Sequence, residues 1–303
     1  MASNADVCAV GRDEDASKTR VSRKTPKGGV VVMSSQPGWQ FVGNVPENYE
    51  RYLVPSIFGP FATDLIDLAA LQENERVLDI ACGTGIVART AARRVGRRGS
   101  VVGLDISAPM LECARSAAAR EDVSVEWREG SALKLPFPDG AFDLVLCQQG
   151  LQFFPDRPMA LREMRRVLAP GGRLGLSVWR SIERSPGFAV LADALSHHIS
   201  PQAGALLTSG PFSLSDTEEL RALIARADFS DITIRPALKM LSYPSPDEFV
   251  RCYAAGSALA GPFASADDHA RAALMGEVKA GLRAYVDKRL AFPIETNVVS
   301  AHK

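Results

Sequence analysis

The chain has 303 residues, and its 35 Lys and Arg residues balance its 35 Asp and Glu residues. This length predicts one large domain, or one domain with an appended lobe. A zero net charge provides no basic field for nucleic acid or an anionic membrane. The chain lacks the run of about 18 apolar residues that a membrane span needs. The N-terminus also lacks the apolar core of an export signal, so we expect a cytoplasmic protein.

The cysteines and histidines give no sign of a disulfide framework or a metal site. The five cysteines are scattered and odd in number, which favours reduced thiols. The pair His197 and His198 has no Cys or carboxylate at ligand spacing, so no metal is predicted.

The first 70 residues divide into two unlike segments. Residues 1–36 are polar, charged and without periodicity, and we expect a disordered leader there. Residues 37–70 carry aromatic and apolar side chains at helical spacing, interrupted by Pro55 and Pro60. This second segment predicts two short helices ahead of the first strand.

The most informative stretch runs from Glu75 to Ala88. A short apolar run, Val77–Ile80, is typical of a buried strand, and a Gly-Thr-Gly turn follows at residues 83–85. Residues 86–95 then change to helical spacing. A strand, a glycine turn and a helix indicate the nucleotide-binding half of a doubly wound α/β fold. Glycines permit unusual dihedrals and let the backbone approach a ligand closely.

Two carboxylates narrow the choice of ligand. Gly83, Gly85 and Ala88 fit a dinucleotide pattern, and Asp105 follows about 20 residues later, as that pattern requires. Asp79, however, lies inside the strand, where its charge would repel a pyrophosphate and favour a cationic group. Asp105 lies near the end of the second predicted strand and can accept hydrogen bonds from both hydroxyls of a ribose.

Further motifs extend the match beyond the glycine turn. Residues 135–143 read Leu-Pro-Phe-Pro-Asp-Gly-Ala-Phe-Asp, and residues 168–174 read Leu-Ala-Pro-Gly-Gly-Arg-Leu. In this order the motifs resemble the class I S-adenosylmethionine-dependent methyltransferases. The branch with the ubiquinone/menaquinone-biosynthesis C-methyltransferases and related small-molecule methyltransferases is the most similar. The resemblance covers Trp39 to Trp179 well and the final strands loosely.

The resemblance implies a fold and a division of the chain. The fold is a Rossmann-like, doubly wound, seven-stranded sheet, mostly parallel with an antiparallel edge strand, and helical insertions cover the pocket. Residues 37–70 would form an N-terminal helical lid over the cofactor, and residues 71–180 the S-adenosylmethionine-binding core. Residues 181–303 would hold the substrate-covering helices and the last two strands.

The resemblance also implies roles for residues that match its motifs. Asp79 would hold the methionine amino end, Gly83 and Gly85 would form the close-approach turn, and Asp105 would accept from the ribose. From spacing alone, either carboxylate could instead cap a helix or a turn. The cofactor-binding candidates are Asp79, Ala81, Gly83, Gly85, Asp105, Ile106, Met110, Ser131, Ala132, Gln148 and Gln149.

Three of these candidates come with qualifications. Met110 is placed where an adenine face could rest, although a core methionine needs no such role. Ser131 stands where the family usually has an Asp that accepts from the adenine amino group, so backbone groups of Ser131 and Ala132 would do most of the reading. Gln148 and Gln149 follow the fourth predicted strand, which places them beside the transferring methyl group.

The acceptor side is less defined. Tyr49, Tyr52, Gln152 and Phe153 are candidates for the lid and the substrate side, although both tyrosines could simply be packing residues. Gln152 stands where relatives often have a histidine, so no general base is evident and no catalytic residue is assigned.

Composition limits the acceptor without naming it. Residues 188–292 are rich in Ala, Leu, Phe and Tyr and poor in clustered charge, which favours a hydrophobic or aromatic small molecule over nucleic acid. O-, C- and N-methylation all remain open, and a homodimer is compatible with the sequence.

Two other functions stay open. One is a non-catalytic S-adenosylmethionine-binding protein of the same fold. The other is an NAD(P)-dependent oxidoreductase, which is disfavoured because no tyrosine is followed by a lysine four residues later.

Overall fold

The computed structural model describes residues 44–303. The leader predicted over residues 1–36 therefore lies outside the described residues.

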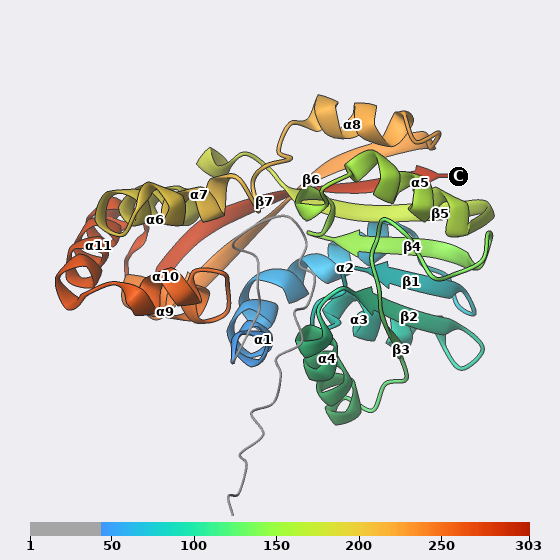
Figure 1. Ribbon diagram of the computed structural model, residues 1–303, viewed down its shortest axis with the longest axis horizontal. Coiled ribbons are helices and arrows are strands. Elements are labelled where there is room, and N and C mark those ends of the chain that lie inside the picture. The colour runs from blue at the N-terminus through green and yellow to red at the C-terminus, as the bar shows by residue number, and fades with distance from the viewer. Residues whose placement is uncertain (1–43) are drawn as a thin grey trace, which may run out of the picture. The chain divides into compact units, whose positions relative to one another are not determined.

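A seven-stranded sheet in the order β3-β2-β1-β4-β5-β7-β6 organises the fold (Figure 1). All neighbouring strands are parallel except that β7 runs antiparallel to both β5 and β6. The predicted fold class is thus confirmed, with the reversed strand lying one place inside the edge. The strands are β1 Arg76–Ile80, β2 Ser100–Asp105, β3 Glu126–Glu129, β4 Phe142–Gln148, β5 Leu168–Trp179, β6 Ser230–Tyr243 and β7 Leu290–His302.

Helices cover both faces of the parallel part of the sheet. Alternate residues of β4 point to opposite faces. Leu146 packs in a cluster with α2 and α3, whereas Cys147 packs in a cluster with α5 and α8. The middle of β4, from Leu144 to Cys147, is therefore apolar, as a strand buried on both faces must be. The helices beside the sheet are α2 Gly59–Leu68, α3 Ile86–Val95, α4 Ala108–Arg120, α5 Arg157–Val167 and α8 Thr217–Ala225.

The segment before β1 is one uninterrupted helical run, which corrects the prediction of two short helices. The α-helix α1, Val45–Asn48, passes directly into a π-helix, η1, Tyr49–Phe58, and then into α2. Pro55 lies inside η1. Proline lacks an N–H and crowds the carbonyl four residues before it in an α-helix, and the wider π-winding relieves this conflict. Gly59 N accordingly donates to Val54 O, five residues back.

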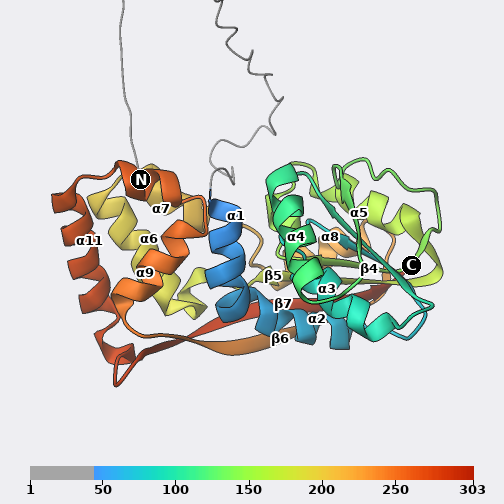
Figure 2. The same ribbon diagram turned by 90° about the horizontal axis from the view of Figure 1, so that it is seen from below.

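A helical lobe packs around the far halves of β6 and β7 (Figures 1 and 2). Aromatic rings meet in its core, where Phe249 is centred 5.5 Å from Phe188 and 5.0 Å from Phe292. The helices of the lobe are α6 Pro186–His198, α7 Pro201–Thr208, α9 Pro246–Ala255, α10 Ala260–Ser265 and α11 Asp268–Gly281.

Two elements begin or end at other residues than their periodicity predicts. Helical spacing over residues 267–290 predicts one long helix, but α11 ends at Gly281, and Leu290 already pairs with Tyr243 in the β6–β7 ladder. Strict alternation over residues 123–127 predicts a strand, but the strand begins only at Glu126. Val123 is still tied to the preceding helix, since its N–H donates to Ala118 O.

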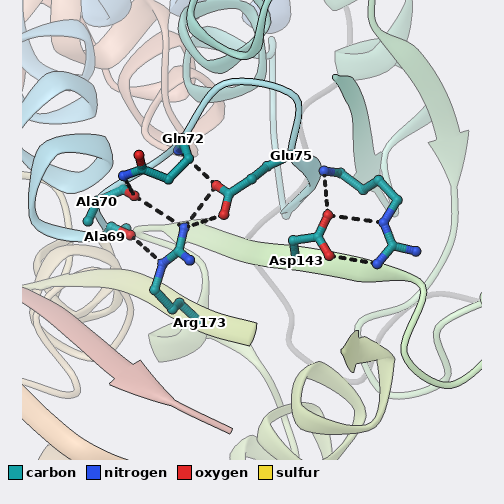
Figure 3. Close-up of polar contacts among 7 residues, drawn as sticks. Ala69, Ala70, Gln72, Glu75, Asp143 and Arg173 are labelled. Carbon is teal, nitrogen blue, oxygen red and sulfur yellow. Dashed lines mark hydrogen bonds and ion pairs between the residues drawn. The ribbon is translucent and has the colours of Figure 1, made fainter. Parts of the chain in front are cut away.

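Two ion pairs lie where the parallel strands begin, which we call the amino edge of the sheet (Figure 3). Arg173 Nη2 lies 2.7 Å from Glu75 Oε1, and Arg76 Nη2 lies 2.6 Å from Asp143 Oδ1. Arg173 also donates from Nε to Ala69 O at the end of α2. Each of these two carboxylates therefore has a guanidinium partner.

Candidate active site

The parallel strands end at the opposite side of the sheet, which we call the carboxyl edge. The first carboxylate there belongs to Asp79, near the end of β1. It is 1% exposed, and its Oδ2 accepts a hydrogen bond of 3.0 Å from Ala88 N in the first turn of α3. The N-cap residue of α3 is Gly85, which has no side chain to satisfy these amides. Asp79 therefore caps α3 from the neighbouring strand. Its Oδ1 receives no hydrogen bond from the described residues.

The second carboxylate, Asp105, is the last residue of β2. Its Oδ2 accepts from Gly83 N at 2.8 Å, and its Oδ1 accepts from Ser107 N at 2.9 Å. Both acids thus act as caps, which was the alternative left open from the sequence. Because a carboxylate oxygen can accept more than one hydrogen bond, capping leaves each acid able to bind a ligand as well.

The two acids make this edge selective for positive charge. Burial raises the pKa of Asp79 to about 8, and repulsion from Asp105 adds to this, while the Ala88 N–H opposes it. Burial also raises the pKa of Asp105, against the hydrogen bonds from Ser107 and Gly83. No ion pair among the described residues reaches either acid. A cation in this crevice would therefore be stabilised by both.

The two glycines of the turn serve different purposes. Both have positive φ, +55° at Gly83 and +84° at Gly85. A Cβ on Gly83 would meet only Met110 Cε, at 3.9 Å, so its backbone is open to a ligand. A Cβ on Gly85 would lie 2.2 Å from Trp127 Cη2. Gly85 is thus needed for the packing of Trp127. Ala81, just before the turn, also has a positive φ, of 55°.

An apolar surface lies beside Asp105. Ile106 follows it directly and is 64% exposed, which is unusual for so large an apolar side chain. Met110 is buried against Gly83 near the start of α4. Its helix has Ser107 as its N-cap, because Ser107 Oγ accepts from Met110 N.

The turn after β3 lies against the same strand end. Gly130 N donates to Asp105 O at 3.0 Å, which fixes the turn to β2. Ser131 Oγ accepts from Leu133 N at 3.2 Å, so the hydroxyl oxygen is already used within the turn. Ala132 is buried behind it. Backbone groups are consequently the main polar groups that this turn can offer to a base.

Three glutamines gather at the end of β4. Gln148 Nε2 donates to Phe58 O at 2.9 Å, and Gln149, with φ of 54°, donates from Nε2 to Thr296 Oγ1 at 2.9 Å. Gln152, in the 3-10 turn η2, Leu151–Phe153, donates from Nε2 to Gln149 Oε1 at 3.0 Å. The Oε1 atoms of Gln148 and Gln152 are buried and have no hydrogen-bond partner among the described residues.

The structure separates the two lid tyrosines. Tyr49 stacks on Phe58 with ring centroids 4.8 Å apart. Its pKa is raised by burial and then by the negative charges of Asp105 and Glu50, so its hydroxyl lies close to the acids. Tyr52 instead has the guanidinium of Arg251 4.9 Å above its ring and faces α9. Phe153 is half-buried at the end of η2.

An aromatic chamber adjoins the glutamines and was not predicted residue by residue. It encloses about 20 Å³, room for roughly one water molecule. No charged side chain lines it. Its walls come from η1, β5, α6, the loop after α7, α9 and β7, so no local motif could reveal it. The lining residues are Ile57, Phe58, Trp179, Phe188, Pro211, Phe212, Tyr253 and Ile294.

A buried charge network ties η1 to this side of the sheet. The Arg89 side chain is 1% exposed and lies 2.8 Å from Glu50 Oε1 and 2.6 Å from Glu121 Oε1. In the sequence Arg89 is one of several arginines on a helix, and nothing marks it as buried.

Three further observations concern residues 44–303. No three His, Cys, Asp or Glu side chains in this range are arranged to hold a metal ion. Burial raises the pKa of Cys147 to about 12, so this thiol stays neutral. No helix in the same range is long and apolar enough to cross a membrane.

Comparison with known proteins identifies the family. Residues 77–172 match the family described as "Methyltransferase domain". The ubiquinone/menaquinone biosynthesis C-methyltransferase UbiE of Pseudomonas aeruginosa LESB58 is 38% identical over 238 residues, covering 68% of this chain and 91% of the relative. This chain belongs to the S-adenosylmethionine-dependent methyltransferases. A demethylmenaquinone methyltransferase of Thermus thermophilus is 37% identical over 176 residues, or 54% of this chain and 79% of that one.

Solved structures agree with the fold of this methyltransferase. The YcgJ protein of Bacillus subtilis superimposes with a TM-score of 0.54 at 22% identity, covering 80% of this chain and 97% of that one. Phosphoethanolamine N-methyltransferase 2 of Haemonchus contortus, solved with S-adenosylhomocysteine, also gives 0.54, at 19% identity and 85% and 56% coverage. At these identities the likeness concerns the fold alone.

The described residues fit S-adenosylmethionine, the methyl donor of this family. The crevice has two buried acids for a positively charged ligand and an open backbone at Gly83. Asp105 retains acceptor capacity for hydroxyl groups, and Ile106 offers an exposed apolar face. These are the features that a sulfonium nucleoside with an amino group requires.

Proposed function

We propose that this methyltransferase acts on a small, hydrophobic, aromatic acceptor. The observation that carries the proposal is the aromatic chamber, whose walls lack charge and which begins at Phe58, the residue held by Gln148. UbiE relatives act, by name, in ubiquinone and menaquinone biosynthesis, which supports an aromatic acceptor. Because the chamber holds only about 20 Å³, an acceptor must displace part of its wall on binding.

We assign the cofactor contacts as follows. Asp79 takes the methionine amino group, Asp105 the ribose hydroxyls, and Gly83 provides the close backbone. Ile106 and Met110 flank the adenine, while backbone groups of the turn after β3 read its edge. Support comes from the burial of both acids and from the open space at Gly83.

S-adenosylmethionine supplies an electrophilic methyl group when bound, so the protein's main tasks are orientation and the exclusion of water. Gln148 is placed between the crevice and the chamber, where its amide fixes the η1 backbone. Burial raises the pKa of Tyr49 well above its usual value, so its hydroxyl stays protonated and can donate a hydrogen bond but not act as a phenolate base.

We further propose that the helical run before β1 acts as the lid. Its first part, α1 and η1, makes two polar contacts beside the crevice, namely Phe58 with Gln148 and Glu50 with Arg89, whereas α2 is buried against α3. Residues 181–303 would then supply the acceptor side, because α6, α9 and β7 all line the chamber.

Balanced charge and free cysteines support a cytoplasmic protein without a nucleic acid partner. A homodimer stays a prediction, which light scattering on the purified chain tests.

A mass-spectrometric acceptor screen tests the function. The full chain is incubated with S-adenosylmethionine and a panel of hydroquinones, phenols, amines and short peptides. We expect a gain of one methyl group only on aromatic acceptors, with fragmentation showing whether carbon or oxygen is modified. Methylation of amines or peptides alone, or of nothing in the panel, would contradict the proposal.

A further inference from the structure

The end of β4 carries a hydrogen-bond chain whose direction is fixed. Thr296 Oγ1 donates its only proton to Val178 O at 2.8 Å, because a backbone carbonyl can only accept. The Thr296 oxygen is therefore an acceptor for Gln149 Nε2 at 2.9 Å. Gln149 consequently presents Oε1 to Gln152 Nε2, at 3.0 Å. We call Gln152, Gln149 and Thr296 the amide relay.

The fixed direction determines which atom of Gln152 is left over. Its Nε2 is committed to the relay, so its Oε1 is the atom that faces away from Gln149. Gln152 is 2% exposed, and Oε1 has no hydrogen-bond partner among the described residues. A buried carbonyl oxygen without a donor is rare in proteins and is costly unless a ligand satisfies it.

The relay lies next to residues that line the aromatic chamber. Thr296 stands directly opposite Trp179 in the β5–β7 ladder, and Trp179 lines the chamber. Ile294, two residues before Thr296 and hence on the same face of β7, also lines it. On the other side, Ser213 Oγ donates to Gln152 O at 3.2 Å, and Ser213 directly follows the chamber residue Phe212.

We infer that Gln152 is a specificity-determining residue, which orients the aromatic acceptor by accepting a hydrogen bond from its hydroxyl group. This inference rests on the aromatic acceptor proposed above. The relay holds the amide in one orientation, so the atom of Gln152 that lacks a partner among the described residues is the acceptor Oε1. An acceptor with a free hydroxyl satisfies Oε1, whereas the same ring with that hydroxyl methylated leaves it buried and unpaired.

Two matched probes test this property separately from methyl transfer. The full chain, saturated with S-adenosylhomocysteine, is titrated with 1-naphthol and with 1-methoxynaphthalene, which keeps the ring and the oxygen but lacks the donor. For the wild type we expect 1-naphthol to bind at least about ten-fold more tightly. In Gln152→Met, which preserves length without an amide, the ratio of the two affinities falls to near one.

Two further variants complete the test. Gln202→Met places the same substitution on the exposed face of α7 and leaves the ratio unchanged. Thr296→Val removes the hydroxyl that anchors the relay and should reduce the affinity ratio part of the way. If Gln152→Met does not fold, the ratio in Thr296→Val tests the role of Gln152.

The outcomes separate the inference from the proposed function. A wild-type ratio near one, or a high ratio retained in Gln152→Met, overturns the role of Gln152 while leaving an aromatic acceptor intact. A purely structural role would lower both affinities together without changing their ratio. Failure of both probes to bind the wild type contradicts the aromatic acceptor itself, and this inference with it.

Discussion

The two edges of the sheet treat their carboxylates in opposite ways. At the amino edge, Glu75 and Asp143 each lie within 2.7 Å of an arginine nitrogen (Figure 3). At the carboxyl edge, Asp79 and Asp105 are more deeply buried, yet within residues 44–303 their hydrogen bonds come from backbone amides alone. The pKa of Asp143 is accordingly lowered, chiefly by its hydrogen bond from Arg76, whereas burial raises the pKa of Asp79.

This difference separates the carboxylates that are paired within the fold from those that we propose bind the ligand. A paired acid stabilises the fold without a ligand, whereas a buried acid without a cation destabilises it until a ligand supplies one. The same rule extends to the neutral amides, because the unpartnered oxygens of Gln148 and Gln152 also lie at the carboxyl edge. The following predictions test this contrast.

The largest effect concerns Asp79 and pH. Its pKa of about 8 in the folded protein exceeds the ordinary value of 3.8. Between these values the folded protein holds a proton that the unfolded chain has released, so stability falls as pH rises through this range. Asp79→Asn removes that dependence. Its free energy of unfolding, measured relative to that of the wild type, should therefore rise by on the order of 5 kcal/mol between about pH 4 and about pH 8. Chemical denaturation across this range measures it.

Asp143 supplies the opposite sign as a control. Because its pKa is lowered, its contribution is present above the unfolded pKa and is lost as pH falls through the folded one. The free energy of unfolding of Asp143→Asn should therefore come closer to that of the wild type at low pH. If the Asp79→Asn difference stayed constant across pH, the buried acid would have to be ionised or paired at every pH tested.

The second prediction compares one substitution at both edges. Asp105→Ala removes two ribose contacts and should weaken binding of S-adenosylhomocysteine by about 2–4 kcal/mol, as for charged hydrogen bonds. Asp143→Ala lies outside the crevice and should lower the melting temperature without changing affinity. Calorimetric titration gives the affinities. Unchanged affinity in Asp105→Ala would refute the ribose assignment.

The smallest effect concerns the contact between the lid and the core. Glu50→Gln removes one of the two carboxylates of the buried Arg89 and should destabilise the protein by about 2 kcal/mol. Arg93→Ala breaks a pair in which the arginine is 48% exposed, and we expect a loss below about 1 kcal/mol. Urea denaturation compares them. Equal losses would show that Glu50 contributes no more than a surface charge does.

A feature of this protein could be predicted from the sequence when the residues that produce it lie close together in the chain. The glycine turn and both acids lie within or next to the strands that position them, and local spacing was enough to find them. The aromatic chamber draws on six separate elements, and only its composition was visible. The burial of Arg89 and the contact of Trp127 with Gly85 depend on tertiary packing, which one chain's spacing does not encode.

Some errors have the same origin. Pro55 was read as a helix break, but the surrounding core favoured a change of winding instead. The helix expected to reach residue 290 stops at Gly281, and Leu290 instead pairs with Tyr243 of β6, a partner that is distant in the sequence.

Strand β7 carries a consequence for how the protein comes apart. Phe292 belongs to the core of the helical lobe, Val298 to the core beneath α2 and α3, and Val299 to the core beneath α5 and α8. One backbone thus runs through all three cores. Neither the helical lobe nor the rest of the sheet can unfold without removing β7 side chains from the core of the other. We therefore expect the protein to denature as one cooperative unit, and a cut within β7 would destabilise both parts at once.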